Sequence, residues 1–195
     1  LAGVLRLWQL GNVPLSPNWD EVALGYDAYS IISTGKDEYG KFLPVVLRSF
    51  DDYKPALYAY LAIPSVLVFG LNEFGVRFSS AVFGMIAVLA TYFLVKELFS
   101  TYSKFEIGNL KLEIIALLSA LFIAISPWSI QFSRVAFEAN DGGALNILAA
   151  LFFLKGLKRP KLLLLSTFFA GLNIYSYQSE KVFTPLLVLA LCIIY

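Results

Sequence analysis

The sequence contains no histidine and a single cysteine, Cys192, which lies in an apolar run near the end of the chain. Without imidazole, the chain lacks the commonest general base and metal ligand, and one thiol excludes a disulfide framework and a thiolate metal site. Glycine-rich phosphate loops, dinucleotide fingerprints and basic, aromatic-studded nucleic-acid surfaces are also missing. Acid–base chemistry must therefore come from carboxylates, lysine or tyrosine, and no cofactor is expected.

Charged residues are scarce and hydrophobic residues abundant. Only 15% of the residues are charged, 58% are hydrophobic, and the mean hydropathy is +0.72. Several apolar runs approach the roughly 20 residues that a helix needs to cross a bilayer. These features predict an all-α, polytopic transmembrane protein. The predicted spans are 78–98, 112–128, 144–157 (extended back toward residue 139), 162–177 and 182 onward.

The chain is predicted to form one transmembrane domain, residues 1–195, and to be a fragment of a longer protein, because it starts without methionine and stops inside an apolar run. Residues 1–17 are expected to be the end of a truncated first span, with Arg6 and Trp8 as interfacial anchors. Residues 18–77 are expected to form an external loop with juxtamembrane amphipathic helices. Residues 78–195 then supply about five transmembrane helices.

A polar loop from Asn18 to Lys54 holds seven of the chain's 14 Asp and Glu residues. Capping side chains near its start predict a helix from residues 18–20 to Gly35. On that helix Asp20 and Asp27 share one face, and the opposite face is apolar or aromatic. This pattern is typical of a helix that lies on a membrane surface with its carboxylates turned to water. The apolar face consists of Val22, Tyr26 and Tyr29.

Basic residues predict the orientation of the chain in the membrane. Two loops rich in lysine and arginine are assigned to the cytoplasm by the positive-inside rule. The segment Pro55–Gly70 is only about 16 residues long and contains Pro64, so we expect it to dip into the outer leaflet rather than cross. The acidic loop then faces outside. The basic residues of the two loops are Lys96, Lys104 and Lys111, and Lys155, Lys158, Arg159 and Lys161.

This orientation brings charged residues of three segments to one external surface, as an active site at the membrane face requires. Asp20 and Glu21 are the candidate catalytic carboxylates, and the alternative is that they are first-turn acids that complement a helix dipole. Lys54 is the candidate phosphate contact, and its alternative is an ordinary interfacial lysine. The full set is Asp20, Glu21, Lys54, Arg134, Glu138, Asp141, Glu180 and Lys181.

The remaining candidates also have simpler interpretations. Arg134 and Glu138 are four residues apart and are predicted to face each other on a helix, either as a weak surface pair or as functional groups. Asp141 precedes two glycines and is either a site residue or a helix cap. Tyr175 and Tyr177 form an aromatic belt or stack on substrate. A divalent ion held by Asp20, Glu21 and Glu138 is a minor alternative to a metal-free site.

Several short motifs, in order, resemble the GT-C membrane glycosyltransferases of the protein O-mannosyltransferase and aminoarabinose transferase superfamily. The resemblance implies that Asp20 acts as the base or positions the acceptor, that Lys54 contacts the lipid phosphate, and that Glu138 matches an acid that helps to build the site. Relatives often carry aspartate at the last position. The motifs are Asp20-Glu21, Tyr53-Lys54-Pro55, residues 69–77, residues 133–138 and Tyr175-Ser176-Tyr177.

The implied reaction moves a sugar, with inversion, from a polyprenyl-phosphate-linked donor to a hydroxyl of a protein, lipid or glycan. It is expected on the external face of a membrane, most simply a prokaryotic cell membrane, with Arg134 assisting Lys54 at the phosphate. Two alternatives from other classes are a polytopic transporter or flippase, which needs ionisable residues deep within the spans, and a non-catalytic lipid-binding membrane subunit.

Overall fold

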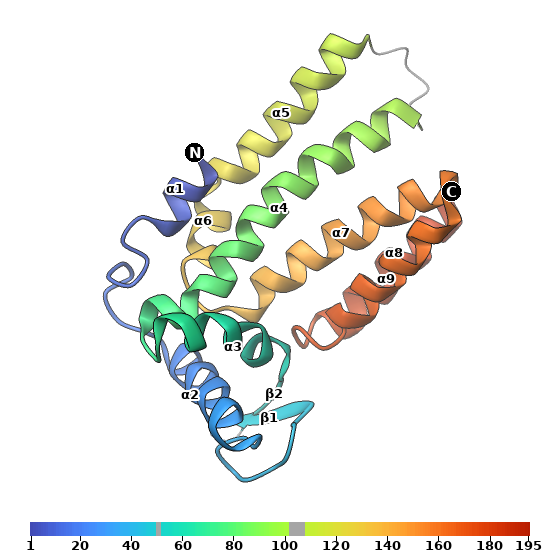
Figure 1. Cartoon of the computed structure of the whole chain (residues 1–195). Coiled ribbons are helices and arrows are strands. Elements are labelled where there is room, and N and C mark those ends of the chain that lie inside the picture. Colours follow the sequence, from blue (N-terminus) through green and yellow to red (C-terminus); the bar gives the residue numbers. More distant parts are fainter. Residues whose placement is uncertain (50–51, 102–107) are drawn as a thin grey trace.

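The computed structural model describes residues 1–49, 52–101 and 108–195, so Lys104 of the predicted cytoplasmic loop lies outside the described residues. The chain forms a helical bundle with a smaller cap at one end (Figure 1). The cap contains α2 (Trp19–Thr34), β1 (Val46–Ser49), β2 (Asp52–Pro55) and α3 (Leu57–Phe69). The bundle contains α1 (Ala2–Leu7), α4 (Glu73–Thr101), α5 (Asn109–Ile125), α6 (Pro127–Ser133), α7 (Glu138–Lys158), α8 (Leu163–Asn173) and α9 (Glu180–Ile194), with a 3-10 turn at Pro160–Leu162.

The long helices of the bundle lie side by side, with α4 in contact with α5 and α7, and α7 in contact with α8 and α9 (Figure 1). Each predicted span overlaps a helix, although the bounds differ by several residues. Within the described residues, α4 is long and apolar enough to cross a membrane, and a second span passes only if α5 and α6 are one segment bent by 58°. The number of crossings therefore stays a prediction.

The predicted span 112–128 ends early because Pro127 interrupts it. The carbonyls before a proline lose their helical partner, and here α5 ends at Ile125 and α6 starts at Pro127. Arg6 caps this break. Its guanidinium is fully buried and donates hydrogen bonds to the carbonyls of Ile123 (3.2 Å) and Ala124 (3.1 Å). The prediction of Arg6 as an interfacial anchor is therefore wrong.

Helix α2 begins and ends as predicted. The side chain of Asn18 accepts a hydrogen bond from the Glu21 amide, and the Glu21 carboxylate accepts one from the Asn18 amide, which completes a capping box. Gly35 ends the helix in the left-handed region, with φ of 72°. This local chemistry sets the position of the two acids in the first turn, Asp20 and Glu21.

A two-stranded antiparallel hairpin follows, and the all-α prediction missed it. Strand β1 pairs with β2 so that Leu47 stands opposite Lys54 and Ser49 opposite Asp52. Side chains alternate between the two faces of a strand, and this alternation buries Leu47 in the cap while Tyr53 is 59% exposed. The short, mixed stretch before Lys54 carries too few residues for a clear strand signal.

Helix α3 packs against both α2 and α4 through small side chains. At a rise of 1.5 Å per residue, its 13 residues extend about 20 Å, short of the roughly 30 Å hydrocarbon core. Gly70, at φ 82°, turns the chain back into α4. The buried core of the cap consists of Leu24, Ala28, Leu47, Ala56, Tyr58, Ala59, Ala62, Val66, Val76 and Ala136.

Only one of the two faces of α2 differs from the prediction. The apolar face is exposed, with Val22, Tyr26 and Tyr29 at 57%, 49% and 48%. Asp27, however, is 1% exposed and accepts a hydrogen bond from the Glu38 amide at 3.3 Å. The prediction that Asp27 faces water is wrong, because residues 36–41 fold back over it. Burial raises the pKa of Asp27 to about 6, with the nearby Glu38 and Asp37 adding to the effect.

Protonation of Asp27 should therefore stabilise the cap. A carboxyl group whose pKa is raised by folding contributes stability that is complete below its unfolded pKa and lost as the pH rises through the folded value, here from about 4 to about 6. The Asp27→Asn variant should lack this loss. We expect its melting temperature to exceed that of the wild type at pH 8 and to match it more closely at pH 4. An equal difference at both pH values would contradict the prediction.

Candidate active site

Asp20 and Lys54, 34 positions apart, form an ion pair between the cap helix α2 and strand β2. The first turn of α2 presents Asp20, and the hairpin register aims Lys54 at it. The Lys54 side chain is 15% exposed and that of Asp20 is 38% exposed. This pair unites two residues that the sequence predicted as separate functional groups.

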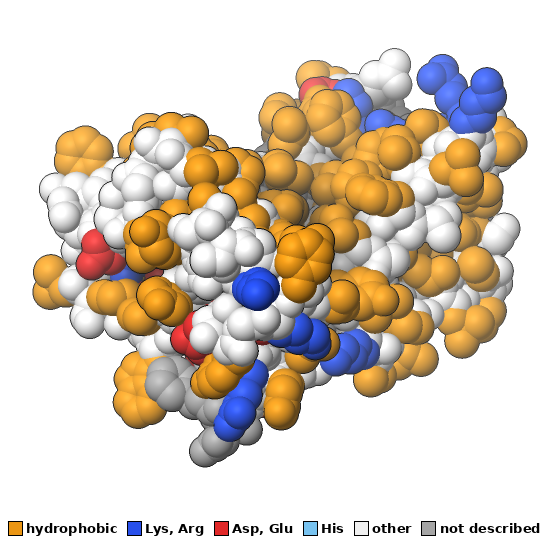
Figure 2. All heavy atoms as spheres, turned by 60° about the horizontal axis from the view of Figure 1, so that its bottom comes forward, with side chains coloured by type: hydrophobic (Ala, Val, Ile, Leu, Met, Phe, Trp, Pro, Cys, Tyr) orange, Lys and Arg blue, Asp and Glu red, His pale blue; other side chains and the backbone are white. Residues whose placement is uncertain are grey.

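The pair lines a cleft of about 640 Å³ between the cap and the end of the bundle. Figure 2 shows this end of the molecule, where acidic and basic side chains lie close together and hydrophobic side chains surround them. The lining residues come from the three segments that were predicted to lie on the same external surface. The lining residues are Trp19, Asp20, Ser49, Asp52, Lys54, Pro55, Phe137, Glu138, Tyr177 and Gln178.

The loop between α8 and α9 closes one side of the cleft. The Gln178 side-chain amide donates a hydrogen bond to the carbonyl of Tyr53, 2.6 Å away, and Lys181 donates to the Gln178 side-chain oxygen at 2.7 Å. Tyr177, a predicted site residue, lies beside Gln178 in the wall. The C-terminal part of the bundle is thus tied to the strand that carries Lys54.

Glu138 forms the inner wall of the cleft at the start of α7. Its side chain is 4% exposed, and Oε1 has no hydrogen-bond partner among the described residues. Burial raises the pKa of Glu138 to about 7, while the nearby positive charge of Lys54 opposes this shift. Glu138 precedes the predicted span 144–157 and its extension toward residue 139, so this carboxyl lies outside the membrane-spanning part. An uncharged carboxyl at this point is a hydrogen-bond donor.

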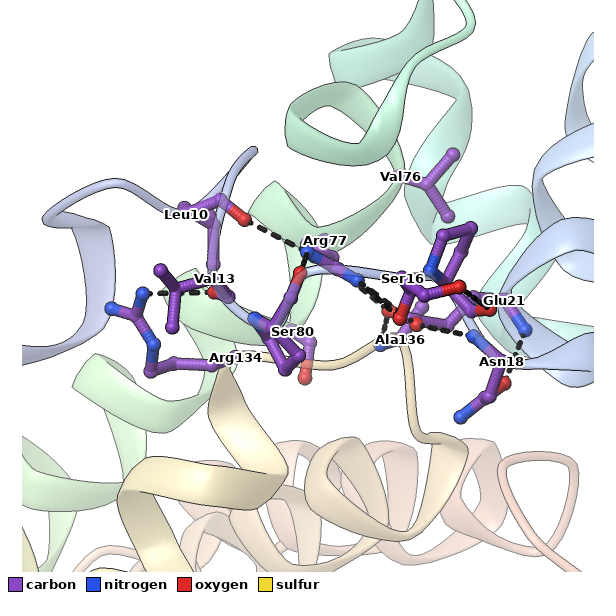
Figure 3. Close-up of polar contacts among 12 residues, drawn as sticks. Leu10, Val13, Ser16, Asn18, Glu21, Val76, Arg77, Ser80, Arg134 and Ala136 are labelled. Atoms are coloured by element: carbon purple, nitrogen blue, oxygen red, sulfur yellow. Dashed lines mark hydrogen bonds and ion pairs between the residues drawn. The ribbon is translucent and has the colours of Figure 1, made fainter.

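Glu21 points the other way from Asp20, into the protein. Its carboxylate forms a two-pronged ion pair with Arg77, at 2.8 Å from Nε and 3.2 Å from the terminal nitrogen. It also accepts the Ala136 amide at 2.9 Å (Figure 3). Both partners are buried, with 3% and 0% exposure. Besides the capping box with Asn18, the contacts of the Glu21 carboxylate hold the start of α2 against α4 and the α6–α7 connection.

Arg77 and Arg134 also fix residues 10–16 in front of α2. Arg77 donates to the carbonyls of Leu10 (3.1 Å) and Pro14 (2.9 Å), and Arg134 donates to the carbonyl of Val13 at 2.9 Å (Figure 3). Two guanidinium groups thereby supply hydrogen bonds to carbonyls of an irregular segment that has no helical partners. The path of this segment determines where α2 starts.

Arg134 therefore does not line the cleft, and its hydrogen bonds to main-chain carbonyls leave the predicted phosphate contact without structural support. The predicted pair of Arg134 with Glu138 on one helix is wrong, because α6 ends at Ser133 and α7 begins at Glu138. Asp141 lies one turn further along α7, is 1% exposed and has no hydrogen-bond partner on either oxygen among the described residues. Tyr175 is 51% exposed and outside the cleft.

The sequence predicted no individual role for Asp52 or for Arg77, which belongs to the motif of residues 69–77, and it grouped Gln178 with Tyr175 and Tyr177 as an aromatic belt or a substrate-stacking group. A signal for Arg77 existed, since a charged residue at the start of an apolar run of more than 20 residues is expensive in a membrane and needs a partner. Gln178 and Asp52 gave no such signal, because polar residues in loops are ordinary. Among the described residues, no group of three or more Asp, Glu or Cys side chains is placed to hold a metal ion.

Comparison with protein families places residues 53–194 in the family of dolichyl-phosphate-mannose-protein mannosyltransferases. The chain belongs to this family. It is therefore a mannosyltransferase-like glycosyltransferase, and members of the family are integral membrane proteins. Lys54, Glu138 and Tyr177 lie inside the matched region, whereas Asp20 and Glu21 precede it. Searches of curated proteins and of solved structures give no match.

The ion pairs of the two adjacent acids, Glu21 with Arg77 and Asp20 with Lys54, should differ in their contribution to stability. Replacing Arg77 by Ala leaves the Glu21 carboxylate buried without its counter-charge, and breaking such a pair costs about 3–5 kcal/mol. We expect Arg77→Ala to lower the melting temperature of the detergent-solubilised protein strongly. Asp20→Asn should lower the melting temperature much less, because Asp20 is 38% exposed and the amide oxygen of Asn can still accept a hydrogen bond from Lys54. Similar losses in both variants would contradict the separation of roles.

Proposed function

We propose that the chain carries the donor-binding and catalytic part of a glycosyltransferase that moves a sugar from a polyprenyl-phosphate carrier to a hydroxyl group. The observation that carries the proposal is the Asp20–Lys54 pair within the cleft. The reaction needs a base that takes the proton of the acceptor hydroxyl and a cation that stabilises the leaving phosphate, and the two must lie close together. The family match supports the class of reaction.

In the proposed mechanism, the donor phosphate replaces the Asp20 carboxylate as the partner of the Lys54 ammonium. Asp20 is then free to accept the proton of the acceptor hydroxyl. The acceptor oxygen forms a bond to the anomeric carbon while the bond from that carbon to the phosphate oxygen breaks. The sugar is transferred with inversion, and the polyprenyl phosphate leaves with its new negative charge beside Lys54.

The surroundings of Lys54 favour this role. The side chain is mostly buried, so a charge that develops on the leaving phosphate is screened less than it would be in water. The cleft wall also contains large apolar side chains, Phe137 and the 76% exposed Trp19. Such a wall suits a substrate that joins a phosphate to a hydrocarbon chain. Tyr177 and Glu138 would then face the sugar, the latter as a hydrogen-bond donor to a hydroxyl.

The external face is part of the proposal. The 13 residues of helix α3 are too few to cross the hydrocarbon core, which favours a cap on the side of the membrane where α4 begins. The positive-inside rule favours a cytoplasmic position for the lysine-rich turn at the far end of α7. A transporter would need its charged groups along the length of the bundle. The cleft instead lies at one end, between the cap and the first turn of α7.

Substitution of Asp20 tests the proposal directly. We expect Asp20→Asn in the complete protein to reduce sugar transfer from a radiolabelled polyprenyl-phosphate-mannose donor by at least about 100-fold, the low end of the contribution of a general base. Glu38→Gln, which removes a carboxylate from an exposed site of the same loop outside the cleft, should retain full activity. Transfer by Asp20→Asn at the wild-type rate, with equal expression and melting temperature, would refute the catalytic role.

The protonation of Glu138 gives a second test. With a pKa of about 7, its side chain is mostly a neutral donor below pH 7 and mostly an anion above it. We expect wild-type turnover at saturating donor to fall as the pH rises through about 7, with an inflection that Glu138→Gln lacks, because the amide stays a neutral donor. The variant should be close to wild type at pH 6. An inflection of the same size in both proteins would show that another group titrates.

A further inference from the structure

A second cleft, of about 440 Å³, lies at the opposite end of the bundle from the Asp20–Lys54 pair. It opens between the last turns of α4 and α7 and the 3-10 turn before α8. Nothing in the proposed transfer reaction uses it. Its lining residues are Glu97, Phe152, Lys155, Lys158, Arg159 and Leu162, which we call the basic groove.

The charge of the basic groove is unbalanced. Three of its six lining residues are cations and one is an acid, Glu97, which already pairs with Lys158 at 2.7 Å. Lys155 and Arg159 have no carboxylate partner within the described part of the chain. The neighbouring Lys96 and Glu113, on α4 and α5, neutralise each other at 2.7 Å and add no net negative charge. Counted over the described residues, the groove therefore carries an excess of positive charge, which attracts an anion.

The arrangement of the cations points into the groove. Phe152 and Lys155 are three residues apart on one face of α7, and Arg159, the residue that follows the last turn of this helix, also lines the groove. The ammonium of Lys155 lies over the ring of Phe93 on α4, 5.3 Å from its centre, which directs this side chain across the gap between the helices. Phe152 and Leu162 supply apolar surface beside the charges.

The distance between the two clefts matches the thickness of a bilayer. Helix α7 connects them, beginning at Glu138 in one and ending at Lys158 in the other (Figure 1). Its 21 residues give a length of about 30 Å, which equals the hydrocarbon core of a typical membrane. When the first cleft lies at one surface, the basic groove lies at headgroup level in the other leaflet.

We propose that the basic groove binds the phosphate headgroup of an anionic phospholipid of the membrane leaflet opposite the catalytic cleft. Arg159 and Lys155 contact the phosphate oxygens, and the first part of an acyl chain packs against Phe152 and Leu162. Guanidinium and ammonium groups are the usual phosphate donors, and basic pockets between membrane helices are suited to such headgroups. The bound lipid would hold α4, α7 and α8 together at the end of the bundle that lies opposite the cap.

Native mass spectrometry of the complete protein tests this site, with titrations of phosphatidylglycerol and of phosphatidylcholine. We expect the wild type to prefer phosphatidylglycerol. The Lys155→Gln/Arg159→Gln variant should lose affinity for phosphatidylglycerol about thirtyfold, as expected for two cations near a membrane surface, with little change for phosphatidylcholine. The charge-matched control Lys111→Gln/Lys161→Gln removes two exposed lysines of the same end that do not line the groove, and its affinity should be unchanged.

Three results would overturn the proposal. One is equal affinity of the wild type and the Lys155→Gln/Arg159→Gln variant for phosphatidylglycerol. Another is an equal loss in the control variant, which would show diffuse attraction rather than a site. The third is binding of inorganic phosphate as tight as that of phosphatidylglycerol, which would assign the groove to a free anion. Retained melting temperature and sugar transfer in both variants establish that folding and catalysis are intact.

Discussion

The buried ion pair between Glu21 and Arg77 is the contact on which the position of the cleft depends. It joins helix α2 to helix α4 and, through the Ala136 amide, to the connection between α6 and α7. Burial of two charges is costly unless both are paired and hydrogen-bonded, and here each prong of the carboxylate is occupied. The same guanidinium also holds the chain that leads into α2. The first turn of α2 is thereby fixed relative to the bundle.

The side chains of consecutive helical residues point about 100° apart, so the adjacent acids Asp20 and Glu21 have different surroundings. Glu21 turns inward and holds the cap in place, so that Asp20 must turn toward the cleft. The hairpin then brings Lys54 to Asp20, and the Gln178 amide ties the hairpin to the loop between α8 and α9. The proposed base and the proposed phosphate contact are positioned by separate elements that share one rigid anchor.

Local sequence signals predicted the helices well but the partners of buried charges poorly. The capping residues around Asn18, the glycine at position 35 and the long apolar runs gave the correct positions of α2 and of the bundle helices, because these signals act within one turn or one span. Charge and spacing also selected Asp20, Lys54 and Glu138, which the structure brings into one cleft. The hairpin escaped notice, since its strands have four residues each.

The errors share a physical cause. Arg6, Arg134 and Asp27 were assigned to water, lipid surface or substrate, because charged side chains are seldom fully buried. Each instead bonds to main-chain groups brought close by the tertiary fold: two arginines to carbonyls and the aspartate to an amide. Every residue has backbone polar groups, so the pattern of side chains in the sequence does not predict which of them will be the partner.

Recognition of the backbone has a consequence for how this chain tolerates change. The segment between α1 and α2 is held by Arg77 and Arg134 through the carbonyls of Leu10, Val13 and Pro14. Any amino acid that permits the same course of the chain offers the same oxygen atoms. Substitutions in this segment that keep its backbone course therefore preserve these hydrogen bonds, whereas substitution of Arg77 or Arg134 removes them.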